Sequence, residues 1–158
     1  MRALKFASLI VVLLICQTGV LPHLAFLGVT PDLVLVAVII FAVLGKKEEA
    51  VLFAALGAGG QDLLSQGWFL QTILKVAVAA VIANFRDEFG GDEYNLAAGL
   101  VALVTPLYLL LELGCLFFIS GREIGPGYIL SKLIAGTIYN LIMVPLLYPL
   151  LRRLSDAG

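Results

Sequence analysis

The chain has 158 residues, of which 61% are hydrophobic, and 10 Lys and Arg against 11 Asp and Glu give a formal net charge of -1. A soluble domain of this length cannot hide so much apolar surface, so the composition indicates a membrane protein. The near-neutral charge leaves no basic field for nucleic acid, which excludes a nucleic-acid-binding protein.

Stretches without charged residues have the length of membrane spans. They cover residues 6–31, 94–111 and 133–151. Together with the Pro and Gly residues that punctuate the chain, they predict six helices. The predicted helices lie at about residues 4–22, 30–45, 48–62, 67–85, 94–119 and 124–152. We therefore expect an all-α integral membrane protein, a six-transmembrane-helix bundle that forms one domain over residues 1–158.

The second and third predicted helices are short. At a rise of about 1.5 Å per residue they reach only about 22 to 24 Å, against a hydrocarbon core of about 30 Å. The alternative is therefore a re-entrant third segment and five crossings. Six crossings put seven Lys and Arg residues on the cytoplasmic side and only Arg122 outside, whereas the re-entrant alternative gives five and three. Because short cytoplasmic segments carry the positive charge, the sequence favours six crossings with both termini cytoplasmic.

Three charged residues lie within predicted spans, where each costs on the order of 3 kcal/mol near the bilayer centre. They are Lys75, Glu112 and Lys132. By helix rise, all three lie about 10–12 Å below the outer surface. We expect Glu112 to pair with Lys75 or Lys132, and Asp62 to supply a second negative charge. Asn140 belongs to the same predicted network because it shares a helix face with Lys132. The alternative is that both lysines snorkel to the surface.

The third predicted helix carries a surface of small residues, which lets another backbone approach closely. Its members are Ala55, Gly57, Ala58, Gly59 and Gly60. The pattern predicts close helix packing either within the chain or at a subunit interface, with a partner's helix or with a second copy in a homodimer.

The residue types that carry catalysis are sparse. The only histidine, His23, lies in the first outer loop, and the nearest nucleophile in sequence, Cys16, lies within the first span. Nucleophilic hydrolysis needs such a base beside its nucleophile. Metal-binding spacings such as His-x-x-x-His and Cys-x-x-Cys are missing. We expect no enzymatic activity, no metal and no cofactor.

Short motifs are spread along the chain. Pro31-Asp32-Leu33 opens an apolar helix, and a glycine-rich helix runs into Gly59-Gly60-Gln61-Asp62-Leu63-Leu64-Ser65. The last helix carries Tyr139-Asn140-Leu141 and closes with Leu151-Arg152-Arg153-Leu154. Together these motifs resemble the rod-shape-determining protein MreD family of bacteria over nearly the whole chain. The family-motif positions are Pro31, Asp32, Asp62 and Asn140.

The resemblance implies a non-catalytic scaffold subunit of the bacterial cell-elongation machinery in the cytoplasmic (inner) membrane. Such a subunit helps to link the cytoskeleton to peptidoglycan synthesis. Its implied partner is the transmembrane helix of MreC, and through MreC the MreB filament, RodA and its penicillin-binding transpeptidase.

The MreD family is also similar in architecture to the substrate-binding subunits of energy-coupling-factor vitamin transporters. That similarity supplies the alternative function, a vitamin-binding membrane subunit. A vitamin binder needs loops that enclose a pocket and form hydrogen bonds, whereas outer loops 23–29 and 63–66 are short and mostly apolar. The sequence therefore favours the scaffold.

Overall fold

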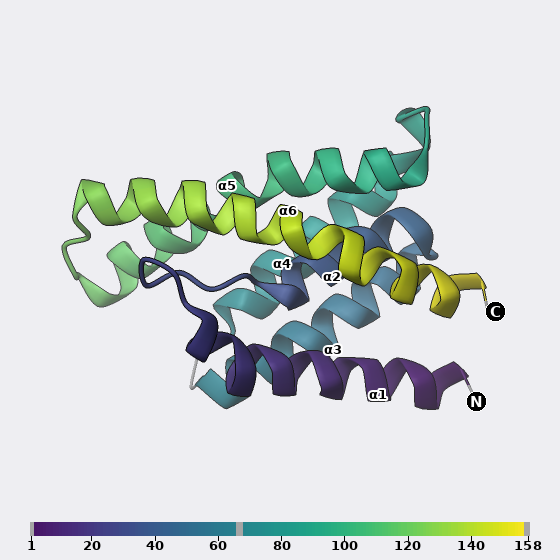
Figure 1. The fold of residues 1–158 in the computed structure, drawn as a ribbon, viewed down its shortest axis with the longest axis horizontal. Helices are drawn as coiled ribbons and strands as arrows, with labels where there is room; N and C mark the ends of the chain where they lie inside the picture. The colour runs from purple at the N-terminus through teal and green to yellow at the C-terminus, as the bar shows by residue number, and fades with distance from the viewer. Residues whose placement is uncertain (1, 66–67, 157–158) are drawn as a thin grey trace.

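The computed structural model describes residues 2–65 and 68–156, and these fold into a bundle of six α-helices (Figure 1). The helices are α1 (Arg2–Ile15), α2 (Leu33–Leu44), α3 (Lys47–Ser65), α4 (Leu70–Phe85), α5 (Glu93–Ser120) and α6 (Pro126–Asp156). A π-helical turn, η1 (Cys16–Val20), and a 3-10 turn, η2 (Leu21–Leu24), continue α1, and a 3-10 turn, η3 (Arg86–Glu88), follows α4. The predicted all-α class and the number of helices are confirmed for the described residues.

Three helical segments are long and apolar enough to cross a membrane. They are Ala3–Leu24, Glu93–Ser120 and Pro126–Asp156, with mean hydropathies of 2.1, 2.1 and 1.7. At most 28% of the residues in their apolar windows are buried inside the bundle, so most of these apolar side chains face outward. Apolar helices with outward apolar faces suggest a membrane protein.

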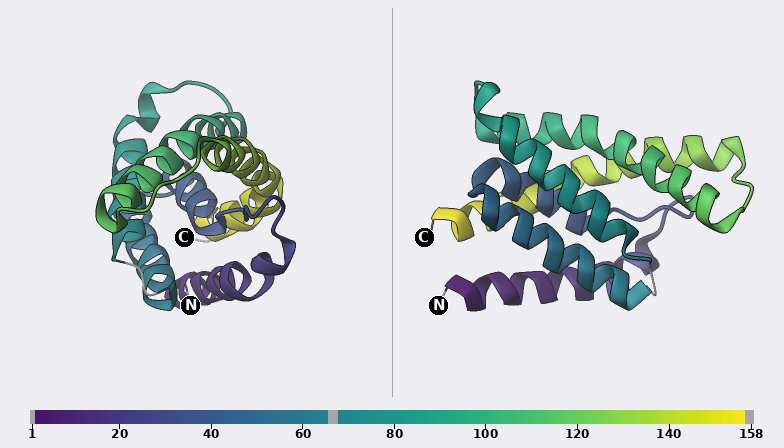
Figure 2. Two further views of the ribbon diagram at one scale, coloured as in Figure 1. Left: turned by 90° about the vertical axis from the view of Figure 1, so that its left-hand side faces the viewer. Right: turned by 180° about the vertical axis from the view of Figure 1, so that it is seen from behind.

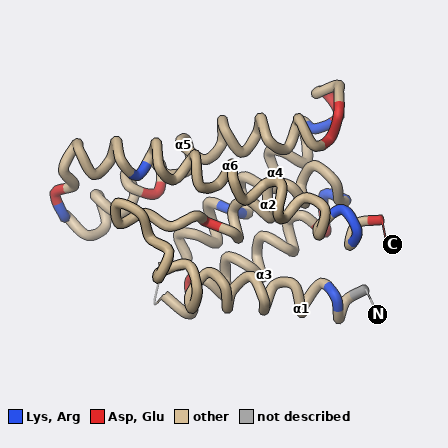
Figure 3. Tube along the Cα trace, in the orientation of Figure 1, with Lys and Arg blue, Asp and Glu red and all other residues tan. Residues whose placement is uncertain are grey.

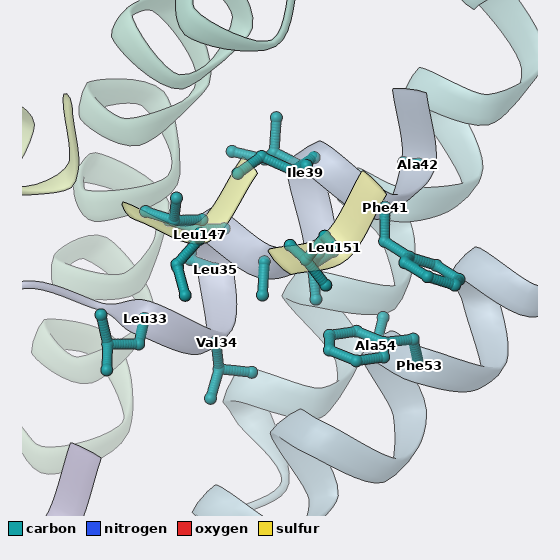
Figure 4. Close-up of a cluster of buried hydrophobic side chains, with 14 of the residues drawn as sticks. Leu33, Val34, Leu35, Ile39, Phe41, Ala42, Phe53, Ala54, Leu147 and Leu151 are labelled. Carbon is teal, nitrogen blue, oxygen red and sulfur yellow. The ribbon is translucent and has the colours of Figure 1, made fainter. Parts of the chain in front are cut away.

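Helix α2 forms the centre of the bundle. Its sequence from Leu33 to Leu44 contains no polar residue, and a helix that is hydrophobic all round is expected to be buried. Every residue from Leu33 to Val43 is in fact buried. The end-on view in Figure 2 shows the other helices around α2. In Figure 4, α2 side chains meet Leu147 and Leu151 of α6, and Phe41 stacks on Phe53 of α3 with ring centroids 5.2 Å apart.

The prediction of a helix over residues 30–45 is wrong at its start. Pro31 disfavours helical backbone at Thr30, and the Asp32 side chain caps the helix by accepting a hydrogen bond from the Leu35 backbone N–H at 3.0 Å. With 12 residues, α2 is only about 18 Å long. A non-helical segment, residues 25–32, leads into it.

The first predicted helix, 4–22, is also not uniform. Its α-helical part ends at Ile15, and the wider π-turn of η1 follows. Within η1, the Gln17 side chain accepts a hydrogen bond from the Leu33 backbone N–H at 2.7 Å and donates one to the Pro31 carbonyl at 3.0 Å. The turn therefore brings an amide against backbone groups at the start of α2 that would otherwise lack partners inside the bundle.

The third predicted segment, 48–62, lies within a longer helix. With 19 residues, α3 is about 28 Å long, close to the thickness of a hydrocarbon core. Helix α4 begins at Leu70, and its predicted first residue, Gly67, lies outside the described residues. The predicted bounds of α5 and α6, 94–119 and 124–152, agree with the structure within four residues.

Both ends of the described chain lie at the same end of the bundle (Figures 1 and 2). Figure 3 shows positive charge near both chain ends and at other points of that side, whereas the opposite end carries the turn with Arg122 and Glu123 between α5 and α6. Further charges lie between these two ends, within the bundle.

Candidate functional site

The N-terminus of α2 lies in a cluster of polar side chains inside the bundle. Besides capping the helix, Asp32 forms an ion pair with Lys75 of α4, with Oδ2 and Nζ 2.7 Å apart. The Asp32 backbone N–H donates to Asn140 Oδ1 of α6 at 2.8 Å. The Asn140 amide in turn donates to Thr105 Oγ1 of α5 at 3.3 Å. The cluster therefore ties the start of α2 to α4, α5 and α6.

Lys75 has no exposed side-chain surface. In addition to the Asp32 carboxylate, its ammonium donates to Gln61 Oε1 at 2.5 Å and Gln71 Oε1 at 2.8 Å. Three acceptors match the three N–H groups of a lysine. The Tyr108 ring lies 5.6 Å from the ammonium, and the Tyr108 hydroxyl donates to Gln71 Oε1 at 3.4 Å. Snorkelling is therefore wrong for Lys75, which is satisfied within the bundle.

Glu112 pairs with Lys132, with an O–N distance of 3.1 Å between α5 and α6. Their side chains are 12% and 20% exposed, so this pair is less deeply buried than the Lys75–Asp32 pair. The sequence left both lysines open as partners of Glu112. The structure assigns Lys132 to Glu112 and Lys75 to Asp32, so the charges form two pairs.

Asp62 does not supply the second negative charge of the predicted network. Its Oδ2 accepts hydrogen bonds from the Thr72 backbone N–H at 2.8 Å and the Thr72 hydroxyl at 2.7 Å. These bonds join α3 to the first turn of α4. The buried Oδ1 of Asp62 makes no hydrogen bond among the described residues.

The small-residue surface of α3 packs within the chain. A Cβ at Gly57 would lie 3.2 Å from Val34 of α2, and one at Gly60 would lie 2.5 Å from Leu14 of α1. Ala58 is fully buried, Ala55 is half-buried, and Gly59 faces Thr72 of α4. The sequence left open whether this surface packs within the chain or at a subunit interface. Gly57 and Gly60 pack within the chain, because the helices that approach them are α2 and α1.

The C-terminus of α2 is held by a residue that the sequence analysis did not single out. The Arg86 guanidinium donates hydrogen bonds to the carbonyls of Gly45, Val43 and Ala42. The Ser155 hydroxyl donates to the Leu44 carbonyl at 3.2 Å. The last carbonyls of a helix lack partners within the helix, and a cation there also interacts favourably with the helix dipole.

Three family-motif positions, Pro31, Asp32 and Asn140, meet at the start of α2, whereas Asp62 binds Thr72. Sequence reasoning missed Gln17 and Gln61, which complete this cluster. A signal was present in the sequence. Burying a side-chain amide such as that of Gln17 or Gln61 without a partner costs free energy, so an amide in an apolar helix predicts a hydrogen-bonding partner.

Cavities beside the Glu112–Lys132 pair are small. One of about 170 Å³ is bordered by Asp62, Gln71 and Glu112, and another of about 160 Å³ by Asp32, Lys132 and Asn140. Pockets for drug-sized ligands usually hold roughly 300 Å³ or more. Within the described ranges, no group of three or more His, Cys, Asp or Glu side chains could hold a metal ion. The polar side chains mainly bind one another and the ends of α2.

Comparison of the chain with family models, with curated proteins and with solved structures gives no match.

Proposed function

We propose that this protein is a non-catalytic membrane scaffold that holds the single transmembrane helix of a partner protein against its own bundle. The sequence resemblance to the MreD family makes the MreC helix the expected partner. Binding of MreC would make the chain a subunit of the bacterial cell-elongation machinery. Through MreC it would be connected to MreB, RodA and its penicillin-binding transpeptidase in peptidoglycan synthesis.

The observation that carries the proposal is an apolar groove of about 250 Å³ between α4 and α5, which we call the α4–α5 groove. It is lined by Leu74, Ala77, Val78, Val81, Ile82, Val104, Leu107, Tyr108 and Leu111. No charged side chain lines it, and the Tyr108 hydroxyl is already bonded to Gln71. Ala77 is exposed, and a small residue in a groove lets a partner's backbone approach closely. An apolar transmembrane helix has the complementary chemistry.

The proposed topology has six crossings, with both termini in the cytoplasm of a bacterial inner membrane. It is supported by the common end of the two termini, by the 19-residue length of α3, and by the concentration of Lys and Arg at the end that holds the termini (Figure 3). Helix α2 is too short to cross alone. In this topology the non-helical residues 25–32 cross the rest of the hydrocarbon core. Gln17 and Asn140 form hydrogen bonds with backbone groups at the end of that segment.

The alternative, a vitamin-binding subunit of an energy-coupling-factor transporter, has less support. The cavities of about 160 and 170 Å³ beside the polar cluster are smaller than a vitamin-sized pocket. The side chains that could bind a ligand are largely engaged with one another.

Capture of MreC from membrane extracts tests the proposal. We expect the wild type to retain MreC and an Ala77→Trp variant, which fills the α4–α5 groove, to lose most of it. An Ile138→Trp variant serves as the matched control, because Ile138 is an exposed residue of α6 that does not line the groove. Failure of the wild type to capture MreC, or equal capture by Ala77→Trp and Ile138→Trp variants that are both folded and inserted, would contradict the proposal.

A further inference from the structure

An open groove of about 380 Å³ lies between α1 and α6. We call it the basic groove. It is lined by Lys5, Ser8, Leu9 and Val12 of α1 and by Leu150, Arg153 and Leu154 of α6. We propose that the basic groove binds an anionic phospholipid, with Lys5 and Arg153 at its phosphate and an acyl chain against the leucines and Val12. This inference goes beyond the proposed scaffold function; it does not depend on MreC binding, but it rests on the proposed topology.

The arrangement of residues in the basic groove matches an amphiphile. Lys5 and Arg153 are close in sequence to the two chain ends, which lie at the same end of the bundle. Val12 lies seven residues further along α1, about 10 Å from Lys5 along the helix axis. One end of the groove is therefore cationic and the part near Val12 apolar.

The two cations are available for a ligand. Among the described residues Arg152 pairs with Asp156, whereas no ion pair involves Lys5 or Arg153. Both side chains are exposed, and the Ser8 hydroxyl beside them is bonded only to the Lys5 carbonyl as a donor, which leaves its oxygen free to accept. Each Lys or Arg near an anionic headgroup is expected to strengthen binding about fivefold.

Charge distinguishes the lipid from a protein occupant. A partner's transmembrane helix carries Lys and Arg at its cytoplasmic flank, and these would repel Lys5 and Arg153 in the proposed topology. A second copy of this chain would bring its own Lys5 and Arg153 to the same end. The α4–α5 groove has no charged lining residue. Of the two grooves, only the basic groove therefore has cations for a phosphate.

Native mass spectrometry of the purified full-length protein tests the inference, with phosphatidylglycerol and phosphatidylcholine of identical acyl chains as probes. We expect the wild type to retain phosphatidylglycerol in preference to phosphatidylcholine. The double variant Lys5→Gln/Arg153→Gln should bind phosphatidylglycerol about thirtyfold more weakly. The control variant Lys46→Gln/Lys47→Gln removes the same charge from exposed residues outside the groove and should bind as the wild type does.

A second variant separates the groove from its charge. Val12→Trp fills the apolar part and leaves both cations in place, and it should also lose phosphatidylglycerol while the protein stays folded by circular dichroism. Equal affinity of the wild type for the two lipids, equal losses in the two double variants, or unchanged binding in Val12→Trp would each overturn the proposal. So would a photo-crosslinker at Leu150 in native membranes that captured a protein, whether a partner or a second copy, and no lipid.

Discussion

A lysine at position 75 is tolerated inside an apolar bundle because its charge and all of its hydrogen-bond donors are matched. The carboxylate of Asp32 lies 2.7 Å away, and the amide oxygens of Gln61 and Gln71 take the remaining donors. Removal of one partner from such a pair leaves an uncompensated buried charge, which usually costs more than the intact pair contributes.

The pairing of charges gives a prediction for double-mutant cycles. Lys75→Met should lower the free energy of unfolding by about 3–5 kcal/mol, because it leaves the Asp32 carboxylate without its counter-ion. Adding Asp32→Asn, which keeps an oxygen to cap α2, should recover part of that loss. Reversible unfolding in mixed micelles, followed by circular dichroism, provides the measurement.

Glu112 supplies the control for this cycle. The effects of Glu112→Gln and Lys132→Met should be coupled, since these side chains lie 3.1 Å apart, whereas those of Glu112→Gln and Lys75→Met should add. Coupling of Glu112 to Lys75, together with additivity between Lys75 and Asp32, would show that the two pairs are assigned incorrectly.

At the scale of elements, α2 is a short buried helix stabilised at both of its ends by side chains from elsewhere in the sequence. Asp32 and its partners hold the N-terminus, and Arg86 with Ser155 holds the C-terminus. A buried helix end without such partners would leave several backbone groups without hydrogen bonds.

Arg86 is therefore predicted to act as a helix cap. Arg86→Met should lower the free energy of unfolding by about 1–3 kcal/mol, because carbonyls at the end of α2 lose their donor. Arg86→Lys keeps the charge but not the planar set of donors, and it should recover only part of the loss. Lys47→Met, at an exposed position on α3, serves as the control and should be close to the wild type in thermal denaturation. Equal stability of Arg86→Met and this control would show that Arg86 does not stabilise the C-terminus of α2.

The six helices could be predicted from the sequence, whereas the contacts between them could not. Apolar stretches between Pro, Gly and charged residues predicted all six helices, because helix length and hydropathy are local properties. The π-turn at Gln17 and the start of α2 at Leu33 were missed, since each depends on hydrogen bonds between segments far apart in the chain. For the same reason the depth of Lys75 could be estimated, but its partner Asp32 could not be identified. The sequence also could not show what the small-residue surface of α3 packs against, because that depends on which helices lie beside α3.

At the scale of the whole molecule, the topology is open to a direct test. Because the positive charge is concentrated at the end of the bundle that holds both termini, a reporter active only in the cytoplasm should work when fused after residue 158. A reporter active only in the periplasm should work when inserted at Arg122, between α5 and α6. Periplasmic activity at the C-terminus would contradict six crossings with both termini in the cytoplasm.

The proposed function requires that the bundle hold a partner's transmembrane helix in the α4–α5 groove. The most direct measurement is site-specific photo-crosslinking in native membranes, with the crosslinker at Val78 or Leu107 in the groove and at Ile138 or Ile142 on α6 as controls. We expect MreC to be captured from Val78 and Leu107 and not from the two α6 positions. Capture of only lipid at Val78 and Leu107, or equal capture of MreC from all four positions, would contradict it.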